Sequence, residues 1–543
     1  MKKKLLLIFV VLVLLGGAVT LYLLLRPRPV RIAMVNYPEA ACKGMMRSVD
    51  KENVTLHVVN HTEELASYDA VIAFGMGLKW TDEDRERVKA LGEKGIAYLT
   101  LMTTTPENDL KNIDSAKLAR FMKYFRSAGL SAGATNLRSG FNYFRAEILG
   151  KALRSGEILD PIDYPGECLF AKNLPDKGFV TVGEFQAYYN EHGFREGAPK
   201  LAFFTGMAAG PFSPDREHLD SIIDGLEKVG FNVYPINAGG KRLEYLNEIN
   251  PDLVVYIPHG RFMMGESKHV AEWFKRQNIP LFAPLTVNML KEAWEADPNG
   301  MLGGFLSQSV VTPEMDGALM PYVIVAQQAD EDGVTYNYTL PDRMETFAQT
   351  LWNYVSLRRK PNKEKRVALY YLKGPGANSL QASGLEVIES LYNVLKELQA
   401  KGYNLEGLPA TAKEFGKVLM TQAPLFNSYA EGSTAAYLLS GYPELVRGDS
   451  LAAWMARVMT PAQMDTLRRR YGAVPGEHQV IEKDGVECIG VAKVRFGNVV
   501  LIPQPAQGVG TNDFKMVHGS AGVPAYPFIA AYLWARLGFK ADV

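Results

Sequence analysis

The stretch that decides the fold class is residues 365–409, KRVALYYLKGPGANSLQASGLEVIESLYNVLKELQAKGYNLEGLP. Its start, 366–372, predicts a buried strand, and the Gly- and Pro-containing residues after it predict a turn. Ser383 and Glu386 have the spacing of a capping box, which predicts the start of a helix. Gly402 suits the C-terminal cap of that helix. The helix would bury one apolar face, made of Leu385, Ile388, Leu391, Tyr392, Leu395 and Leu398.

The rest of the chain repeats this alternation of strand and helix. The sequence predicts strands in two groups, at 30–35, 54–59, 70–74 and 96–99, and at 201–204, 230–236, 253–258 and 280–284. Helices are predicted between them, among others at 81–93 and 215–229. The fold class is therefore α/β, with successive Rossmann-like or flavodoxin-like parallel-sheet domains. We expect an N-terminal anchor at 1–29 and α/β domains at 30–197, 198–358 and 365–543.

The N-terminus predicts a membrane anchor. Lys2, Lys3 and Lys4 precede an uncharged run at 5–25. As a helix, this run is long enough for the about 30 Å hydrocarbon layer of a bilayer. It ends without a small-residue cleavage site, which favours a retained anchor over a cleaved signal peptide. Basic residues in front of the run place the N-terminus in the cytoplasm. We therefore expect an inner-membrane protein with its soluble part in the periplasm.

Composition excludes several classes of function. Lys plus Arg and Asp plus Glu are both 59, so no basic surface for nucleic acid is predicted. Cys42, Cys168 and Cys488 lie too far apart in sequence for a zinc motif or a disulfide framework. No GxxxxGK[ST] phosphate-binding loop occurs, so this chain should not hydrolyse ATP itself.

Several motifs carry a family resemblance. The most specific is LRRKPNKEKRVA at 357–368, which leads directly into the opening stretch. TPEMDG at 312–317, PDR at 341–343, GL at 384–385 and FGNVVLIPQP at 496–505 follow the same family pattern. Together they resemble the large subunits of tetrapyrrole chelatases, the CobN subunit of cobaltochelatase and the H subunit of magnesium chelatase. Thr312 and Gln507 depart from the pattern, where Leu and Arg are usual.

The resemblance implies a large subunit that binds a tetrapyrrole for metal insertion or removal, with a cobaltochelatase-like reaction. The divalent metal would be cobalt, iron or magnesium, and ATP would be used only by AAA-type partner subunits. The predicted anchor fits the haem-utilisation relatives of CobN (HmuS-like), whose partners would be haem-uptake components. A membrane-tethered tetrapyrrole-binding protein without catalysis is the alternative. The resemblance covers about residues 200–543, the front half of a full subunit, so we expect no turnover by this chain alone.

Two sets of candidate site residues follow. His259 comes after the strand predicted at 253–258, and ligands bind beyond the carboxyl ends of parallel strands. The family resemblance adds the positions in the motifs at 312–317 and 496–508 and a turn near 518. Imidazoles and carboxylates can carry pyrrole protons or face a metal. The predicted catalytic residues are His518 and Gln504, and the predicted tetrapyrrole-binding residues are His259, Glu314, Asp316 and Gly508. The residues that would bind the metal are left unknown.

Overall fold

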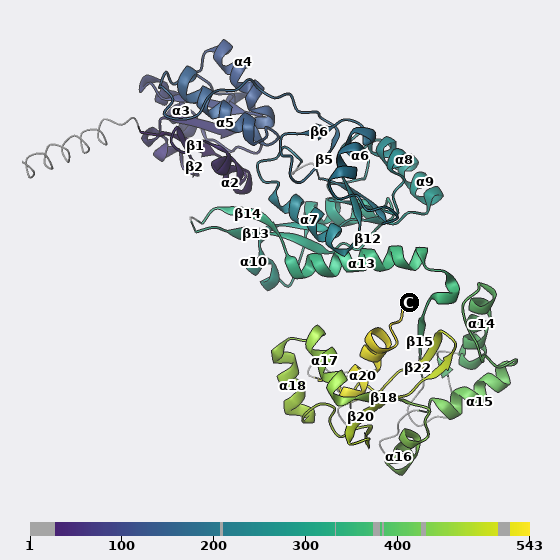
Figure 1. The fold of residues 1–543 in the computed structure, drawn as a ribbon. Helices are drawn as coiled ribbons and strands as arrows, with labels where there is room; N and C mark the ends of the chain where they lie inside the picture. Colours follow the sequence, from purple (N-terminus) through teal and green to yellow (C-terminus); the bar gives the residue numbers. More distant parts are fainter. Residues whose placement is uncertain are drawn as a thin grey trace, which may run out of the picture. The chain divides into compact units, whose positions relative to one another are not determined.

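The computed structural model describes residues 28–206, 210–331, 333–372, 381–382, 385–424, 431–508 and 522–543 (Figure 1). The chain forms two compact units, Met1–Trp352 and Asn353–Val543. Among the described residues, no helix is long and apolar enough to cross a membrane. The anchor predicted at 5–25 lies outside the described residues.

The first sheet is four-stranded and parallel, with strand order β2-β1-β3-β4. Its strands are β1 (Val30–Val35), β2 (Val54–Val59), β3 (Ala70–Phe74) and β4 (Ala97–Leu101). The helices of this region are α2 (Glu39–Ser48), α3 (Asp82–Glu93), α4 (Ser115–Tyr124) and α5 (Ala134–Tyr143). The β3 side chains are all buried, as expected for a strand covered on both faces. The strands predicted at 30–35, 54–59 and 70–74 are confirmed.

The second sheet has the order β12-β10-β9-β7-β8-β5-β6. Its parallel strands are β7 (Lys200–Phe204), β8 (Asn232–Asn237), β9 (Leu253–Tyr256), β10 (Leu281–Phe282) and β12 (Ala318–Leu319). Counted in chain order from β7, these strands lie in the order 2-1-3-4-5, the flavodoxin-like arrangement. Helices of this region are α6 (Val182–Glu191), α7 (Glu217–Val229), α8 (Arg242–Ile249) and α9 (Ser267–Gln277).

Strands β5 (Cys168–Phe170) and β6 (Gly178–Phe179) precede the domain boundary predicted at 197 but belong to the second sheet. They pair antiparallel at the outer edge of the second sheet, with β5 hydrogen-bonded to β8. The second sheet therefore recruits chain from before residue 197. The pairing joins segments that are far apart in the sequence, so a local sequence pattern did not reveal it.

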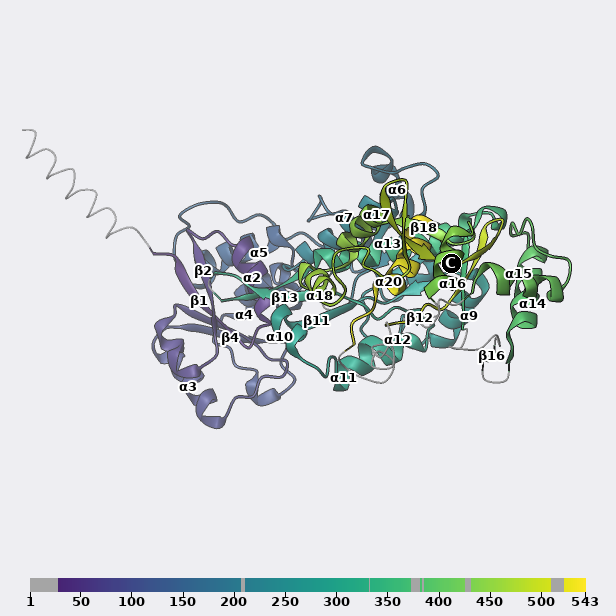
Figure 2. The same cartoon turned by 90° about the horizontal axis from the view of Figure 1, so that it is seen from below.

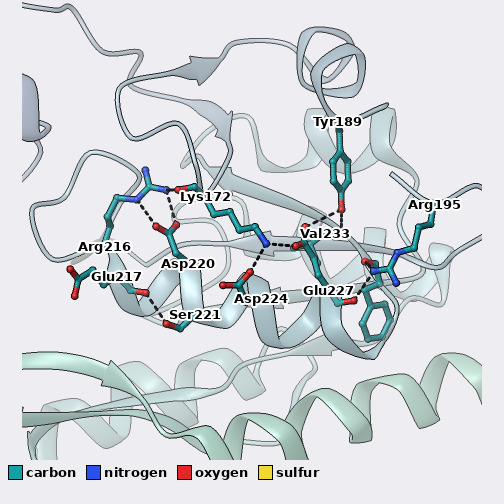
Figure 3. A network of polar contacts seen from close by, with 11 residues as sticks. Lys172, Tyr189, Arg195, Arg216, Glu217, Asp220, Ser221, Asp224, Glu227 and Val233 are labelled. Atoms are coloured by element: carbon teal, nitrogen blue, oxygen red, sulfur yellow. Dashed lines mark hydrogen bonds and ion pairs between the residues drawn. The ribbon is translucent and has the colours of Figure 1, made fainter. Parts of the chain in front are cut away.

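A polar network holds this added segment against α7 (Figure 3). Lys172 follows β5 and pairs with Asp224 and, at 2.7 Å, with Glu227. The Tyr189 hydroxyl of α6 donates to Glu227 at 3.3 Å and accepts from the Val233 amide at 3.1 Å. The residues of this network are fully engaged with one another and with backbone, so we assign the network to fold stability rather than to ligand binding.

A third, small sheet links the two parallel sheets of the first unit. It contains β11 (Leu285–Leu290), β13 (Val323–Ala329) and β14 (Thr335–Thr339), in the order β11-β13-β14. The β13–β14 hairpin reaches α2 of the first sheet region, as both views show (Figures 1 and 2). Thr335 donates through its hydroxyl to Glu39 at 2.8 Å, and Asn337 donates to Asp215 at 2.6 Å. The hairpin thus contacts both parallel-sheet regions.

Short helices follow β11 in the first unit: α10 (Lys291–Ala296), α11 (Gly303–Leu306), a π-helical turn η5 (Ser307–Val311) and α12 (Thr312–Glu314). Ser307 and Thr312 both have right-handed helical dihedral angles, so 303–314 is one continuous helix with a π-turn in its middle. The long α13 (Pro341–Arg359) then leads to the second unit.

The second unit is only partly parallel, unlike the predicted parallel-sheet domain. β15 (Val367–Tyr371) pairs parallel with β22 (Val499–Pro503), which pairs antiparallel with β21 (Val494–Phe496). A separate antiparallel sheet has the order β18-β20-β19, made of β18 (Glu444–Arg447), β19 (Val480–Lys483) and β20 (Val486–Val491). A short antiparallel pair joins β16 (Gln381–Ala382) and β17 (Leu385–Glu386). The helices are α14 (Val387–Ala400), α15 (Ala412–Gln422), α16 (Glu431–Leu439), α17 (Gly448–Val458), α18 (Pro461–Tyr471) and α20 (Tyr526–Leu533).

The capping box predicted at the start of α14 is wrong. The helix begins at Val387, and its N-cap residue is Glu386, which makes no side-chain cap hydrogen bond. Glu386 instead pairs with Gln381 in the short hairpin, while Ser383 lies outside the described residues. Leu385 and Glu386 are paired in the hairpin, and the helix begins directly after them. Gly402 has φ +84°, as the predicted C-terminal cap requires.

Thr460 provides a stability test for the second unit. Its hydroxyl accepts from the Gln463 amide at 3.3 Å, and Gln463 accepts from the Thr460 amide at 2.8 Å, so α18 begins with a complete capping box. We expect Thr460→Ala to lower the free energy of unfolding of this unit by about 1 kcal/mol. Urea unfolding followed by circular dichroism measures the effect. Thr466→Ala, at a partly exposed threonine inside the same helix, removes no N-terminal cap and should change it by only a few tenths of a kcal/mol.

Candidate functional site

A cavity of about 450 Å³ lies at the carboxyl edge of the second sheet. Its walls come from the ends of three neighbouring strands: Thr205 after β7, Asn237 at the end of β8 and Gly239 after it, and Ile257 and His259 after β9. In the 2-1-3-4-5 order, β7 and β9 are the strands between which the chain direction around the sheet reverses. Loops diverge at that point, which is where open α/β sheets bind ligands. The cavity volume is in the range of small-molecule sites.

Arg242, at the start of α8, is a buried cation in the wall of this cavity. Its Nε donates to the Ala238 carbonyl at 2.7 Å, and Nη1 donates to the Phe262 carbonyl. The guanidinium also lies 5.5 Å from the Phe204 ring centroid and 4.9 Å from that of Phe262. Burial lowers the pKa of Arg242. In the part of the chain that the structure describes, no carboxylate forms an ion pair with it, so its charge favours an anionic ligand.

The neighbouring wall already binds a carboxylate. Glu167 accepts hydrogen bonds from the amides of Gly239 at 2.7 Å, Gly240 at 2.6 Å and Lys241 at 3.3 Å, just before α8. Although partial burial favours its protonated form, these amides hold the pKa of Glu167 below its usual value. The backbone amides at the start of α8 thus already bind the Glu167 carboxylate. We therefore consider Arg242 as the group that could bind an external anion.

The structure brings three of the predicted binding residues into one region of the first unit, but in different roles. His259 is exposed and lines the cavity. The Asp316 side chain is completely buried and pairs with Arg261, at 2.7 Å from Nε and 2.5 Å from Nη2. Asp316 also accepts from the Phe262 amide at 2.7 Å, so it positions the cavity loop rather than lining the cavity. Glu314 is exposed and does not line the cavity either.

Gln504 occupies a comparable position in the second unit. It follows β22 at the carboxyl edge of the parallel pair β15–β22, and its backbone amide donates to the Tyr371 carbonyl at 2.8 Å. Its side-chain Nε2 donates to the Tyr532 hydroxyl at 2.8 Å, and the Tyr532 ring stacks on Tyr370 with centroids 4.8 Å apart. Gly508 is buried nearby in sequence, and His518 lies outside the described residues.

Sequence reasoning missed Arg242. A basic residue shortly after a Gly-Gly turn at a strand end was the available signal, but only the strand order shows that this turn lies at the switch point. No group of three or more His, Cys, Asp or Glu side chains within the described ranges could hold a metal ion. Cys42, Cys168 and Cys488 are buried and free, in agreement with the absence of a predicted disulfide framework.

The strand order gives the first unit a flavodoxin-like α/β sheet, and the cavity lies at the switch point of that sheet. The family model described as CobN/Magnesium Chelatase matches residues 122–543. The chain therefore belongs to the CobN/magnesium chelatase family, as the sequence motifs predicted.

Individual relatives agree with this assignment. The aerobic cobaltochelatase subunit CobN of Pseudomonas aeruginosa is 23% identical over 93% of this chain and 40% of its own length. The H subunit of the magnesium chelatase of Rhodobacter capsulatus is 25% identical over 70% of this chain and 32% of its own. The solved catalytic subunit of cobaltochelatase from Mycobacterium tuberculosis has the same fold, with a TM-score of 0.70 at 19% identity over 95% of this chain and 42% of that one. The chain thus spans well under half the length of these relatives.

Proposed function

We propose that this chain binds a tetrapyrrole for metal insertion or removal, as part of a chelatase-type reaction. The observation that carries the proposal is the family match over residues 122–543. The Pseudomonas relative is a cobaltochelatase subunit, which supports a cobaltochelatase-like reaction, and the Rhodobacter relative is a magnesium-chelatase subunit. The proposed metal substrate is cobalt, magnesium or iron. ATP would be hydrolysed by AAA-type partner subunits.

We further propose that residues 5–25 anchor the chain in the inner membrane, with the described residues in the periplasm. The length and lack of charge of that run support this placement. A periplasmic location would favour the haem-utilisation branch of the family and partners among haem-uptake components.

Gln504 and His518 are the proposed catalytic residues. An imidazole at 518 can accept a pyrrole proton, and an amide oxygen at 504 can face a metal. The hydrogen bond from Gln504 to Tyr532 orients the amide at the strand edge, beside a stacked pair of tyrosines. Such a flat aromatic surface suits stacking by a macrocycle. Gly508 is proposed to let the backbone come close to the ligand.

Titration of the full chain with haem and with protoporphyrin IX tests the proposal. We expect a shift of the porphyrin absorption band and micromolar binding, about −8 kcal/mol. Gln504→Ala and His518→Ala should each weaken binding about tenfold, while Gln422→Ala, in α15 of the same unit, should leave it unchanged. Free porphyrin released from haem, or cobalt inserted in the presence of partner subunits and ATP, would distinguish removal from insertion. Binding without either product would identify a non-catalytic tetrapyrrole-binding protein, and no absorption shift at all would refute the proposed function.

A further inference from the structure

We infer that the cavity at the switch point of the second sheet binds a carboxylate of the tetrapyrrole, while the macrocycle lies on the exposed apolar helix 303–314. This inference rests on the proposed function and gives the substrate a second contact surface, in the first unit. Its two parts are a cation that forms no ion pair with a carboxylate of the described chain and an apolar surface beside it.

The cationic part is Arg242. Its charge is buried in the cavity wall, and its hydrogen bonds within the described chain go to backbone carbonyls. The other charged groups near the cavity have partners of their own: Arg261 pairs with Asp316, and Glu167 accepts from the backbone amides before α8. The charge of Glu167 also partly opposes the lowering of the Arg242 pKa by burial. Glu266, at the cavity rim, lies 3.5 Å from His269. A buried cation is stabilised by an anion that enters the same low-dielectric space. Carboxylate is therefore the group that we assign to this cavity.

The apolar part is the helix 303–314 and its flanks. Phe305 is 56% exposed, Leu302 61% and Met315 64%, and Val311 on the same helix is 50% exposed. Of the residues 303–314, only Pro313 is buried. Large apolar side chains gathered on one short segment mark a binding surface, because single exposed apolar residues are usually scattered. The helix is labelled by α11 and α12 in Figure 2.

The two parts are joined directly. The Gly260 amide, in the loop after β9, donates to the Gln308 carbonyl at 2.8 Å, which fixes the middle of the helix to the cavity loop. Met264, 77% exposed, lines the cavity and extends the apolar surface on that side. A flat apolar ring that carries carboxylates on its edge fits these surfaces. Its carboxylate would bind Arg242, and the ring would lie on Met264 and Phe305. A small inorganic anion would use only the cavity, and a purely apolar ligand would use only the helix.

Paired ligands test the inference on the full chain in detergent. Protoporphyrin IX carries two free carboxylates, and its dimethyl ester carries none. We expect the wild type to bind the diacid at least about tenfold more tightly than the diester. Arg242→Met should reduce this ratio to about one, whereas Phe305→Asp should weaken both ligands about tenfold. The ratio is the decisive readout, since a fold defect would weaken both ligands alike.

Exposed residues supply variants that do not threaten folding. His259→Glu at the cavity should lower the ratio, while His61→Glu, exposed after β2 and not in the cavity wall, should not. Leu439→Asp, an exposed leucine in the second unit, is the matched control for Phe305→Asp. An unchanged ratio in both Arg242→Met and His259→Glu would overturn the inference while leaving the proposed function standing. Absence of porphyrin binding by the wild type would overturn both.

Discussion

Asp316→Ala is expected to lower the free energy of unfolding of the second-sheet region by about 3 kcal/mol, the cost of breaking a buried ion pair. The Asp316 side chain has no solvent exposure, and the variant would leave the Arg261 guanidinium and the Phe262 amide without their acceptor. Native-state hydrogen exchange of the β7 and β9 amides measures the loss, because these central strands open only when the sheet unfolds.

Glu314→Ala is the matched control. Glu314 is a carboxylate two positions away in the same motif, but it is exposed, so its removal should change the free energy of unfolding by less than about 0.5 kcal/mol. Equal effects of the two substitutions would show that the ion pair with Arg261 does not hold the cavity loop. The comparison also separates a structural role for Asp316 from the direct substrate contact that the sequence motif predicted.

The second large change in the free energy of unfolding is expected for substitution of Asp215. Burial raises the pKa of its carboxyl to about 7, against the lowering effect of the hydrogen bond from Asn337. At about 1.4 kcal/mol for each pKa unit, the difference from the ordinary value of 3.8 corresponds to about 4 kcal/mol of destabilisation when Asp215 is charged. Asp215→Asn removes this charge. We expect it to raise the free energy of unfolding at about pH 8 by up to about that amount.

The direction of the pH dependence follows from the raised pKa. The folded state binds the Asp215 proton more tightly than the unfolded state, so stability from this group is complete below pH 3.8 and is lost as the pH rises to about 7. The advantage of Asp215→Asn over the wild type should therefore grow between about pH 4 and about pH 8 in urea unfolding. Asn337 Oδ1 is buried without a partner in the described structure. A protonated Asp215 carboxyl could donate to it, and so could the side-chain amide that the Asp215→Asn substitution introduces.

The buried His218 changes the pH dependence of stability in the opposite direction to Asp215, so its contribution must be separated from that of Asp215. Burial is the largest effect on its pKa and lowers it to about 4, so its contribution to stability is lost as the pH falls from 6.5 to about 4. Well above pH 6.5 it is neutral in both states, and the comparison at about pH 8 reports on Asp215 alone. Glu217→Gln, an exposed carboxylate two positions further on, should show no comparable gain. An Asp215→Asn variant that is no more stable than the wild type at that pH would contradict the raised pKa.

The sequence predicted the local elements well, because their signals lie within a few residues. The helix predicted at 81–93 contains α3, and the strand predicted at 366–372 contains β15. Thr460 and Gly402 have the capping roles that their residue types favour. The family resemblance was confirmed because its motifs are contiguous. Features that depend on pairing between distant segments were not recovered, and β5, added to the second sheet from before residue 197, is the clearest example.

For the candidate site too, local features could be predicted from the sequence, whereas contacts between distant segments could not. The position of His259 beyond a strand end could be read from the sequence, and the structure places it in the cavity wall. The burial of Asp316 could not be predicted, because it depends on Arg261, 55 residues away. Arg242 became a candidate only when strand order placed its turn at the switch point. The roles predicted for Gln504, Gly508 and His518 stay predictions.

The β13–β14 hairpin has a consequence for how this protein is divided into fragments for experiment. It belongs to the later part of the first unit, yet Thr335 bonds to Glu39 near the start of the described chain. The family match also begins at residue 122, inside α4, whose Phe121 is packed in the core of the first sheet region. Neither the similarity limit nor a cut near residue 197 is thus a safe end for an expressed fragment. A fragment of the first unit should run without interruption through Trp352 and keep α13 complete to Arg359.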